Sequence, residues 1–174
     1  MVDFFLSWTL RCITHKERDY QNPKLEAYCK RITSLLLFGD VEKLNQYEVQ
    51  QVKTWLQWKR VDLCAEFYLL NKETQKEEKY ALLLENKVYT SIHDNQLENY
   101  KQLFQQDYEG ENTFLEYVYF SCKDTLSDWE KEQCAAAGYR AYTMNEVLDL
   151  VQGDQTWDFT GNALFDEFWL SNWG

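Results

Sequence analysis

The chain has 174 residues, of which 45% are hydrophobic, so we expect residues 1–174 to form one domain with a substantial core. Aromatic residues make up 17% of the chain and need burial, which disfavours a disordered protein. The net charge of −11 disfavours a protein that holds nucleic acid mainly by neutralising phosphates, because that mode requires a surplus of Lys and Arg.

Hydrophobic periodicity divides the chain into helical and extended segments. Apolar residues at three- and four-residue spacing predict helices over 3–12 and 24–38, and the second should begin after Asn22-Pro23 and end at Gly39. The polar run 71–79 is predicted to be a hairpin loop. Further strands are predicted at 47–58, 60–70, 79–87, 113–121 and 139–144, and further helices at 92–106, 126–137, 145–152 and 162–172.

The resulting order is ααβββαβαβαα, which predicts an α/β or α+β fold. Three consecutive strands joined by short connections should form an antiparallel meander. The helix at 92–106 then acts as a crossover, which makes the pairing of strand 113–121 parallel. We therefore expect a mixed central sheet covered by helices.

Five cysteines form no CxxC pair and lie in apolar stretches, as buried thiols do in a reducing compartment. With only His15 and His93 beside them, no familiar zinc ligand set is present. The first twelve residues fit neither a signal peptide nor a membrane span. These patterns predict a cytoplasmic protein without membrane contact.

Three charged residues interrupt apolar strands where solvation would normally be lost. Glu85 and Lys87 follow the run ALLL and share one face of the strand, about 7 Å apart. Asp62 lies between Val61 and Leu63 in the preceding strand. Equal hairpin arms around a loop centred near position 74 would set Asp62 beside Glu85.

Two carboxylates and a backbone carbonyl, such as that of Asn86, are the hard oxygen ligands that Mg²⁺ prefers. A cation held by Asp62 and Glu85 would lower the pKa of a bound water, and Lys87 could orient that water and offset phosphate charge. The predicted chemistry is metal-assisted phosphodiester hydrolysis with Mg²⁺ or Mn²⁺.

Asp62 followed by Glu85-Asn86-Lys87 resembles the D…(D/E)xK signature of the PD-(D/E)XK nuclease superfamily, and the αβββαβ order resembles its restriction-endonuclease-like core. Gln96 and Tyr100 form a QxxxY pattern similar to the RecB-like and lambda-exonuclease-like branch, and they share a helical face. The stretch 82–100 looks closest to bacterial members found near restriction and phage-defence genes.

The resemblance implies a divalent-metal nuclease whose partner is nucleic acid, with DNA as the expected substrate. It also implies an acidic residue from an early helix, for which Glu26 is the candidate. The sequence departs from the family name at one position, since Val61 stands where the proline would be.

Other interpretations of these residues stay open. The tripeptide Glu77-Glu78-Lys79 also reads ExK and is expected in a solvated loop. Asp62 and Glu85 could lie at an exposed edge or pair with Lys59, Arg60 or Lys87. Gln96 and Tyr100 could be a solvated amide and a core aromatic, and His93 a surface residue at a helix start.

The C-terminal segment is rich in large apolar side chains. We expect it to pack on its own domain, with a dimer or partner surface as the alternative. A non-catalytic binding or assembly module with the nuclease fold is the rival function, favoured by the acidic charge and this segment. The large apolar side chains of this C-terminal segment are those of Trp157, Phe159, Leu164, Phe165, Phe168, Trp169 and Trp173.

Overall fold

The computed structural model describes residues 1–14, 22–88, 92, 95–153 and 158–171. The helices are α1 (Val2–Arg11), α2 (Pro23–Phe38), α3 (Gln96–Asp107), α4 (Asp128–Ala137), α5 (Met144–Gln152) and α6 (Ala163–Phe165), and the strands are β1 (Tyr47–Trp58), β2 (Val61–Asn71), β3 (Glu77–Lys87), β4 (Thr113–Ser121) and β5 (Arg140–Thr143). Short 3₁₀ turns follow α1 and precede β1, and a π-helical turn, Asp166–Leu170, follows α6. Within these residues, no helix is both long enough and apolar enough to cross a membrane.

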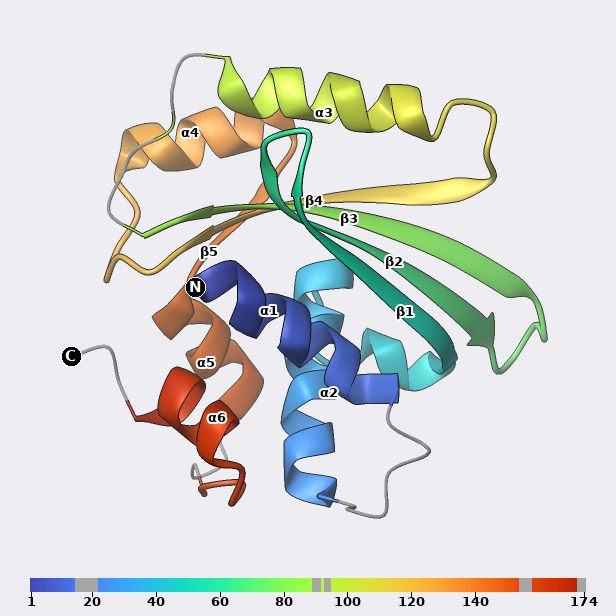
Figure 1. The fold of residues 1–174 in the computed structure, drawn as a ribbon, viewed down its shortest axis with the longest axis vertical. Helices are drawn as coiled ribbons and strands as arrows, with labels where there is room; N and C mark the ends of the chain where they lie inside the picture. The colour runs from blue at the N-terminus through green and yellow to red at the C-terminus, as the bar shows by residue number, and fades with distance from the viewer. Residues whose placement is uncertain (15–21, 89–91, 93–94, 154–157, 172–174) are drawn as a thin grey trace.

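The five strands form one sheet in the order β1-β2-β3-β4-β5. β1, β2 and β3 are antiparallel neighbours, whereas β3, β4 and β5 run parallel to one another. The helices α3 and α4 cover one face, and α1, α2, α5 and α6 lie on the other (Figure 1). The predicted mixed α/β sheet is confirmed, including the parallel pairing that the crossover through α3 imposes.

Two predictions of secondary structure are wrong, one about where a strand begins and one about the type of a helix. The run 71–79 is only partly a loop, because β3 begins at Glu77, paired with Leu70. Lys79 lies in the strand, ion-paired with Glu66 of β2 and aligned with Thr113 of β4, so cross-strand contacts stabilise an extended backbone that the local polar sequence does not favour. The predicted helix 162–172 is instead a single α turn followed by the π-helical turn.

Side chains on each face of the sheet form a separate apolar core. The larger core lies on the α1/α2 side and reaches from Val2 to Trp169, and the smaller one lies under α3 and α4. All five cysteines are free thiols, and four of them are buried. Both faces of the central strands are thus covered, which explains why β3 contains the continuous apolar run Tyr80–Leu84.

The C-terminal segment packs mainly against its own domain. Phe165, Phe168 and Trp169 are buried, and the indole Nε1 of Trp169 donates to Thr9 Oγ1 of α1 at 3.0 Å. Phe159 and Leu164 remain exposed. Trp157 and Trp173 lie outside the described residues, as do His15 and His93.

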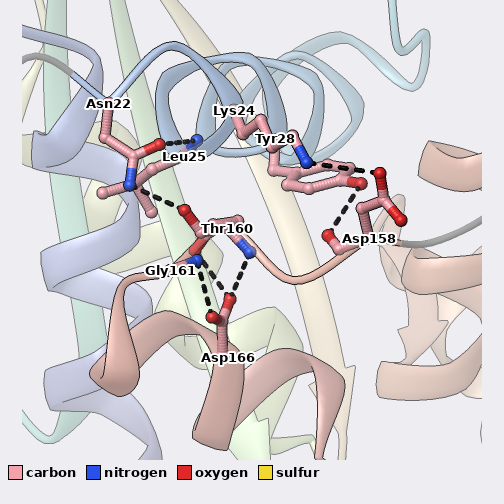
Figure 2. Close-up of polar contacts among 8 residues, drawn as sticks. All are labelled: Asn22, Lys24, Leu25, Tyr28, Asp158, Thr160, Gly161 and Asp166. Carbon is pink, nitrogen blue, oxygen red and sulfur yellow. Dashed lines mark hydrogen bonds and ion pairs between the residues drawn. The ribbon is translucent and has the colours of Figure 1, made fainter.

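Polar contacts hold the loop before α6 against the start of α2 (Figure 2). Asn22 caps α2 by accepting from Leu25 N at 3.0 Å, and its Nδ2 donates to Thr160 O at 2.9 Å. Asp166 accepts from the backbone N–H and the hydroxyl of Thr160, and from Gly161 N. Asn22 therefore both caps α2 and anchors the loop before α6.

Gly39 ends α2 in the left-handed region, at φ 72°, where Arg140 of β5 donates to the last helical carbonyls, those of Leu36 and Leu37. A Cβ at Gly39 would lie 3.1 Å from Arg140 Cδ. We predict that Gly39→Ala lowers the free energy of unfolding in urea by more than the roughly 1–2 kcal/mol cost of the left-handed conformation. Gly110→Ala is the matched control, because φ is 79° there and a Cβ meets nothing within 4 Å. Equal losses in the two variants would contradict the contact with Arg140.

Candidate metal centre

The candidate site lies where β2 separates from β3. Their ladder ends at Leu63 and Leu84, while β3 continues beside β4 through Lys87. Continuing the β2–β3 register by one residue sets Asp62 opposite Glu85, as the equal-arm hairpin predicted. In place of a further ladder bond, the backbone N–H of Asn86 donates to Asp62 Oδ2 at 2.9 Å. The end of β2 is thereby fixed to β3 by a carboxylate.

Glu85 is the most deeply buried charged group of this cluster, with 1% of its surface exposed. Its Oε1 lies 2.7 Å from Lys87 Nζ and accepts from Gln96 Nε2, also at 2.7 Å. Its Oε2 is buried and makes no hydrogen bond. The ion pair with Lys87 matches one open interpretation of Glu85, but the depth of burial excludes an exposed edge position.

Burial raises the pKa of Glu85 to about 7. The hydrogen bond from Lys87 opposes this rise, the negative charge of Asp62 adds to it, and the nearby backbone N–H of Asp62 opposes it again. Burial also raises the pKa of Asp62, and the backbone N–H of Asn86 only partly offsets that effect. Both carboxyl groups therefore lack the positive charge that would fully stabilise their ionised forms.

The helix α3 contributes two of the predicted residues. Gln96 is its first residue, and Gln96 Nε2 lies between Glu85 Oε1 and the hydroxyl of Tyr100, which accepts at 3.2 Å. This contact requires the i, i+4 spacing, which puts both side chains on one face of the helix. The structure thus brings Asp62, Glu85, Lys87, Gln96 and Tyr100 into one connected cluster.

Glu26 does not join this cluster. It is exposed on α2 and lines a cavity with Tyr47, whose β2 partner is Asn71, at the opposite end of β2 from Asp62. The acidic side chain that an early helix brings to the site is that of Asp3, which accepts from Asn86 Nδ2 at 2.8 Å. Its negative charge also raises the pKa of Asp62. Sequence reasoning missed Asp3, although an acidic residue in the first turn of a predicted helix was visible.

The donor set fits a hard divalent cation held mainly by water. Among the described residues, no group of three or more His, Cys, Asp and Glu side chains is arranged to hold a metal. Asp62 and Glu85 supply two carboxylates. Mg²⁺ is commonly bound by one or two carboxylates, with waters completing its octahedral coordination. The buried, unpartnered Oε2 of Glu85 is the specific atom that such a cation would satisfy.

The structure thus combines a mixed sheet with a buried glutamate, a lysine two residues later and an aspartate on the adjacent strand. The chain belongs to the PD-(D/E)XK nuclease superfamily, whose family model matches residues 5–157. Comparison with curated proteins and with solved structures gave no match. The placement in the RecB-like branch therefore stays a prediction.

Because folding raises the pKa of Glu85, the folded protein holds this proton more tightly than the unfolded chain does. Without divalent metal, the free energy of unfolding should fall as pH rises from about 4.5 to about 7, and should stay lower above that range. Glu85→Gln removes this titration. We predict that the variant is more stable than the wild type near pH 8, by on the order of 1–3 kcal/mol, and that the gap narrows near pH 5.

Urea unfolding across this pH range, in the presence of a chelator, measures the effect. Glu109→Gln is the control, because Glu109 is exposed on the turn after α3. A constant difference between Glu85→Gln and the wild type at every pH would show that the carboxyl group does not titrate in this range.

Proposed function

We propose that this chain is a divalent-metal-dependent nuclease that hydrolyses phosphodiester bonds in DNA, with residues 1–174 forming one catalytic domain. The observation that carries the proposal is the buried Oε2 of Glu85, which makes no hydrogen bond while Lys87 neutralises the other oxygen. A buried carboxylate oxygen without a partner is costly, and a bound cation would remove that cost. Superfamily membership supports the same chemistry.

In this proposal Asp62 and Glu85 hold Mg²⁺ or Mn²⁺. The cation would supply a Lewis acid that lowers the pKa of a water and offsets negative charge on the phosphate. Lys87, whose ammonium group lies 2.7 Å from Glu85 Oε1, would orient the attacking water and stabilise charge on the phosphate in the transition state. Asp3, through Asn86, would hold the end of β3 in place.

Gln96 and Tyr100 would act on the same site from α3. The amide of Gln96 fixes the rotamer of Glu85 through its hydrogen bond to Oε1. The hydroxyl of Tyr100, anchored by that amide, is available to contact substrate. The QxxxY pattern alone predicted that the amide holds a phosphate or a water and that the phenol contacts substrate or the lysine; we assign the amide to Glu85 instead because of its contact with Oε1.

The acidic net charge is compatible with this function if metal ions mediate the approach to phosphate. Phage defence or nucleic-acid processing in the cytoplasm is the setting that the sequence resemblance suggests. The rival proposal is a non-catalytic module that retains the fold. Such a module would use exposed apolar side chains such as Phe159 and Leu164 to contact a second copy or a protein partner.

We predict that Lys87→Ala reduces cleavage of DNA by at least 100-fold while Mn²⁺ still binds, since this change removes transition-state stabilisation but neither proposed metal ligand. Linear, circular and single-stranded substrates should be compared, with Mn²⁺ affinity measured by calorimetry. Lys76→Ala is the control, because Lys76 is exposed in the turn at the opposite end of β3. Absence of both metal binding and cleavage in the wild type would favour the non-catalytic module, and unchanged cleavage by Lys87→Ala would remove the role of the lysine.

Gln96→Ala should weaken Mn²⁺ binding by about 10-fold or more, because Glu85 would lose the hydrogen bond that orients it. Gln106→Ala on the same helix is the control, since that side chain is exposed. Equal Mn²⁺ affinity in the two variants would exclude Gln96 as a positioning residue.

A further inference from the structure

The end of the β1–β2 hairpin differs in charge from the rest of the chain. Residues 53–60 read KTWLQWKR and contain Lys53, Lys59 and Arg60 with no acidic residue, in a protein whose net charge is −11. Two tryptophans, Trp55 and Trp58, lie between Lys53 and Lys59. Basic side chains interleaved with aromatic rings are a composition suited to binding a nucleic-acid strand.

The hairpin turn exposes its two cations. Lys59 and Arg60 connect Trp58 to Val61, and both are exposed. Lys59 is engaged, because its Nζ lies 2.5 Å from Asp107 Oδ1 of α3 and 4.7 Å from the centre of the Trp58 ring. Within the described part of the chain, no hydrogen bond or ion pair involves the guanidinium of Arg60. The guanidinium of Arg60 is therefore a permanent positive charge that is available to a ligand at the β1–β2 turn.

A cavity of about 230 Å³ lies between this hairpin and the C-terminal half of α3. The hairpin rises from the sheet toward α3 (Figure 1). The aromatic walls of the cavity are formed by Trp55, Trp58, Phe104 and Tyr108. The carboxylates of Glu66, Asp107 and Glu111 also line the cavity. Trp58 meets Phe104 edge to face at 5.8 Å, whereas Trp55 keeps 41% of its surface exposed. An open aromatic face thus borders a polar-lined space, which we call the hairpin cavity.

The hairpin cavity and the candidate metal centre share β2. Cys64, which lines the cavity, is two residues from Asp62, about 7 Å along the strand, and Arg60 lies in the turn two residues before Asp62. The side chain of Gln57, from the other arm of the hairpin, hydrogen-bonds to Asp62. Trp58 and Phe104 belong to the apolar core on the α3 side of the sheet, the side on which Gln96 contacts Glu85. A strand with one phosphate at the metal centre can therefore reach the cavity with a neighbouring nucleotide.

We propose that the hairpin cavity binds an unpaired nucleobase next to the scissile phosphate, so that the substrate is single-stranded or locally unpaired nucleic acid. The inference rests on the proposed nuclease function and names its substrate class. Trp55 stacks on the base, and Arg60 contacts the phosphate that follows it. Asp107, whose Oδ1 is held by Lys59, accepts from a base amino group through Oδ2, as carboxylates do with cytosine N4.

The mixture of charges favours a nucleotide over other occupants. The three carboxylates of the cavity are ion-paired, Asp107 with Lys59 and both Glu66 and Glu111 with Lys79. Among the described residues of the hairpin, the charge without a partner is therefore that of Arg60. A nucleotide combines an anionic phosphate with a flat base that carries amino donors, and so matches both Arg60 and the aromatic, polar-lined cavity. A base inside an intact duplex cannot enter, because its faces are stacked and its edge is paired.

The test is equilibrium binding of fluorescently labelled DNA, single-stranded and duplex, in Ca²⁺ buffer, with the length of the DNA checked on a gel afterwards. Trp55→Ala should weaken single-strand binding by about 5- to 100-fold and should affect duplex binding much less. Trp55→Phe should restore most of the affinity. Arg60→Ala should lower the slope of log affinity against log salt by about 1.

Phe114→Ala and Lys76→Ala are the matched controls, since Phe114 is 48% exposed on β4 and Lys76 is exposed in the β2–β3 turn. Unfolding curves of all variants establish that each is folded. Equal single-strand affinity in Trp55→Ala and Phe114→Ala would overturn the base site. Displacement of DNA from the wild type but not from Trp55→Ala by spermidine would also overturn it, because the cavity would then be a cation site.

Cleavage measured separately in Mg²⁺ distinguishes this inference from the proposed function. If single-strand binding depends on Trp55 but no cleavage occurs, the base site stands and the nuclease proposal fails. If cleavage depends on Lys87 while Trp55→Ala binds and cuts single strands as Phe114→Ala does, the nuclease proposal stands and the base site fails.

Discussion

A carboxylate buried beneath a helix imposes the main physical constraint on this protein. Glu85 is placed near the end of the central strand β3, where an ionised group without partners would be strongly destabilising. Lys87 and Gln96 satisfy one of its oxygens, and the other is left without a partner. Gln96 from α3 and Lys87 from β3 both contact this carboxylate, while Leu97 and Phe104 pack α3 onto the sheet beside it.

The separation of β2 from β3 links the two regions to which we assign function. If the two strands stayed paired to their ends, Asp62 would be part of a regular ladder, and the hairpin beyond it would lie flat along the sheet. The carboxylate of Asp62 instead accepts the N–H of Asn86, and the hairpin leans on α3 through Lys59 and Trp58. The β1–β2 hairpin therefore carries both a proposed metal ligand and the proposed base-binding element.

Helix α1, which packs on the opposite face of the sheet, also contributes a side chain to the site. Asp3 reaches Asn86 because α1 packs across β1 and β2, and α1 is itself held by Trp169 of the C-terminal segment through Thr9. Phe165, Phe168 and Trp169 of this segment thus contribute to the core. Among the described residues of this segment, Phe159 and Leu164 are exposed and open to contact with a partner.

Local sequence determined most of the secondary structure and the mixed sheet, because apolar periodicity, an N-cap such as Asn22 and a left-handed Gly39 act within a few residues. It left the register of the β2–β3 hairpin open. The same patterns singled out Asp62, Glu85 and Lys87 as charges in apolar strands. Tertiary structure alone decided that Asp3 rather than Glu26 approaches Asp62, and that β3 extends to Glu77. It alone created the hairpin cavity between β1 and α3. These outcomes depend on how helices and strands far apart in the chain pack together, and no short stretch of sequence specifies that packing.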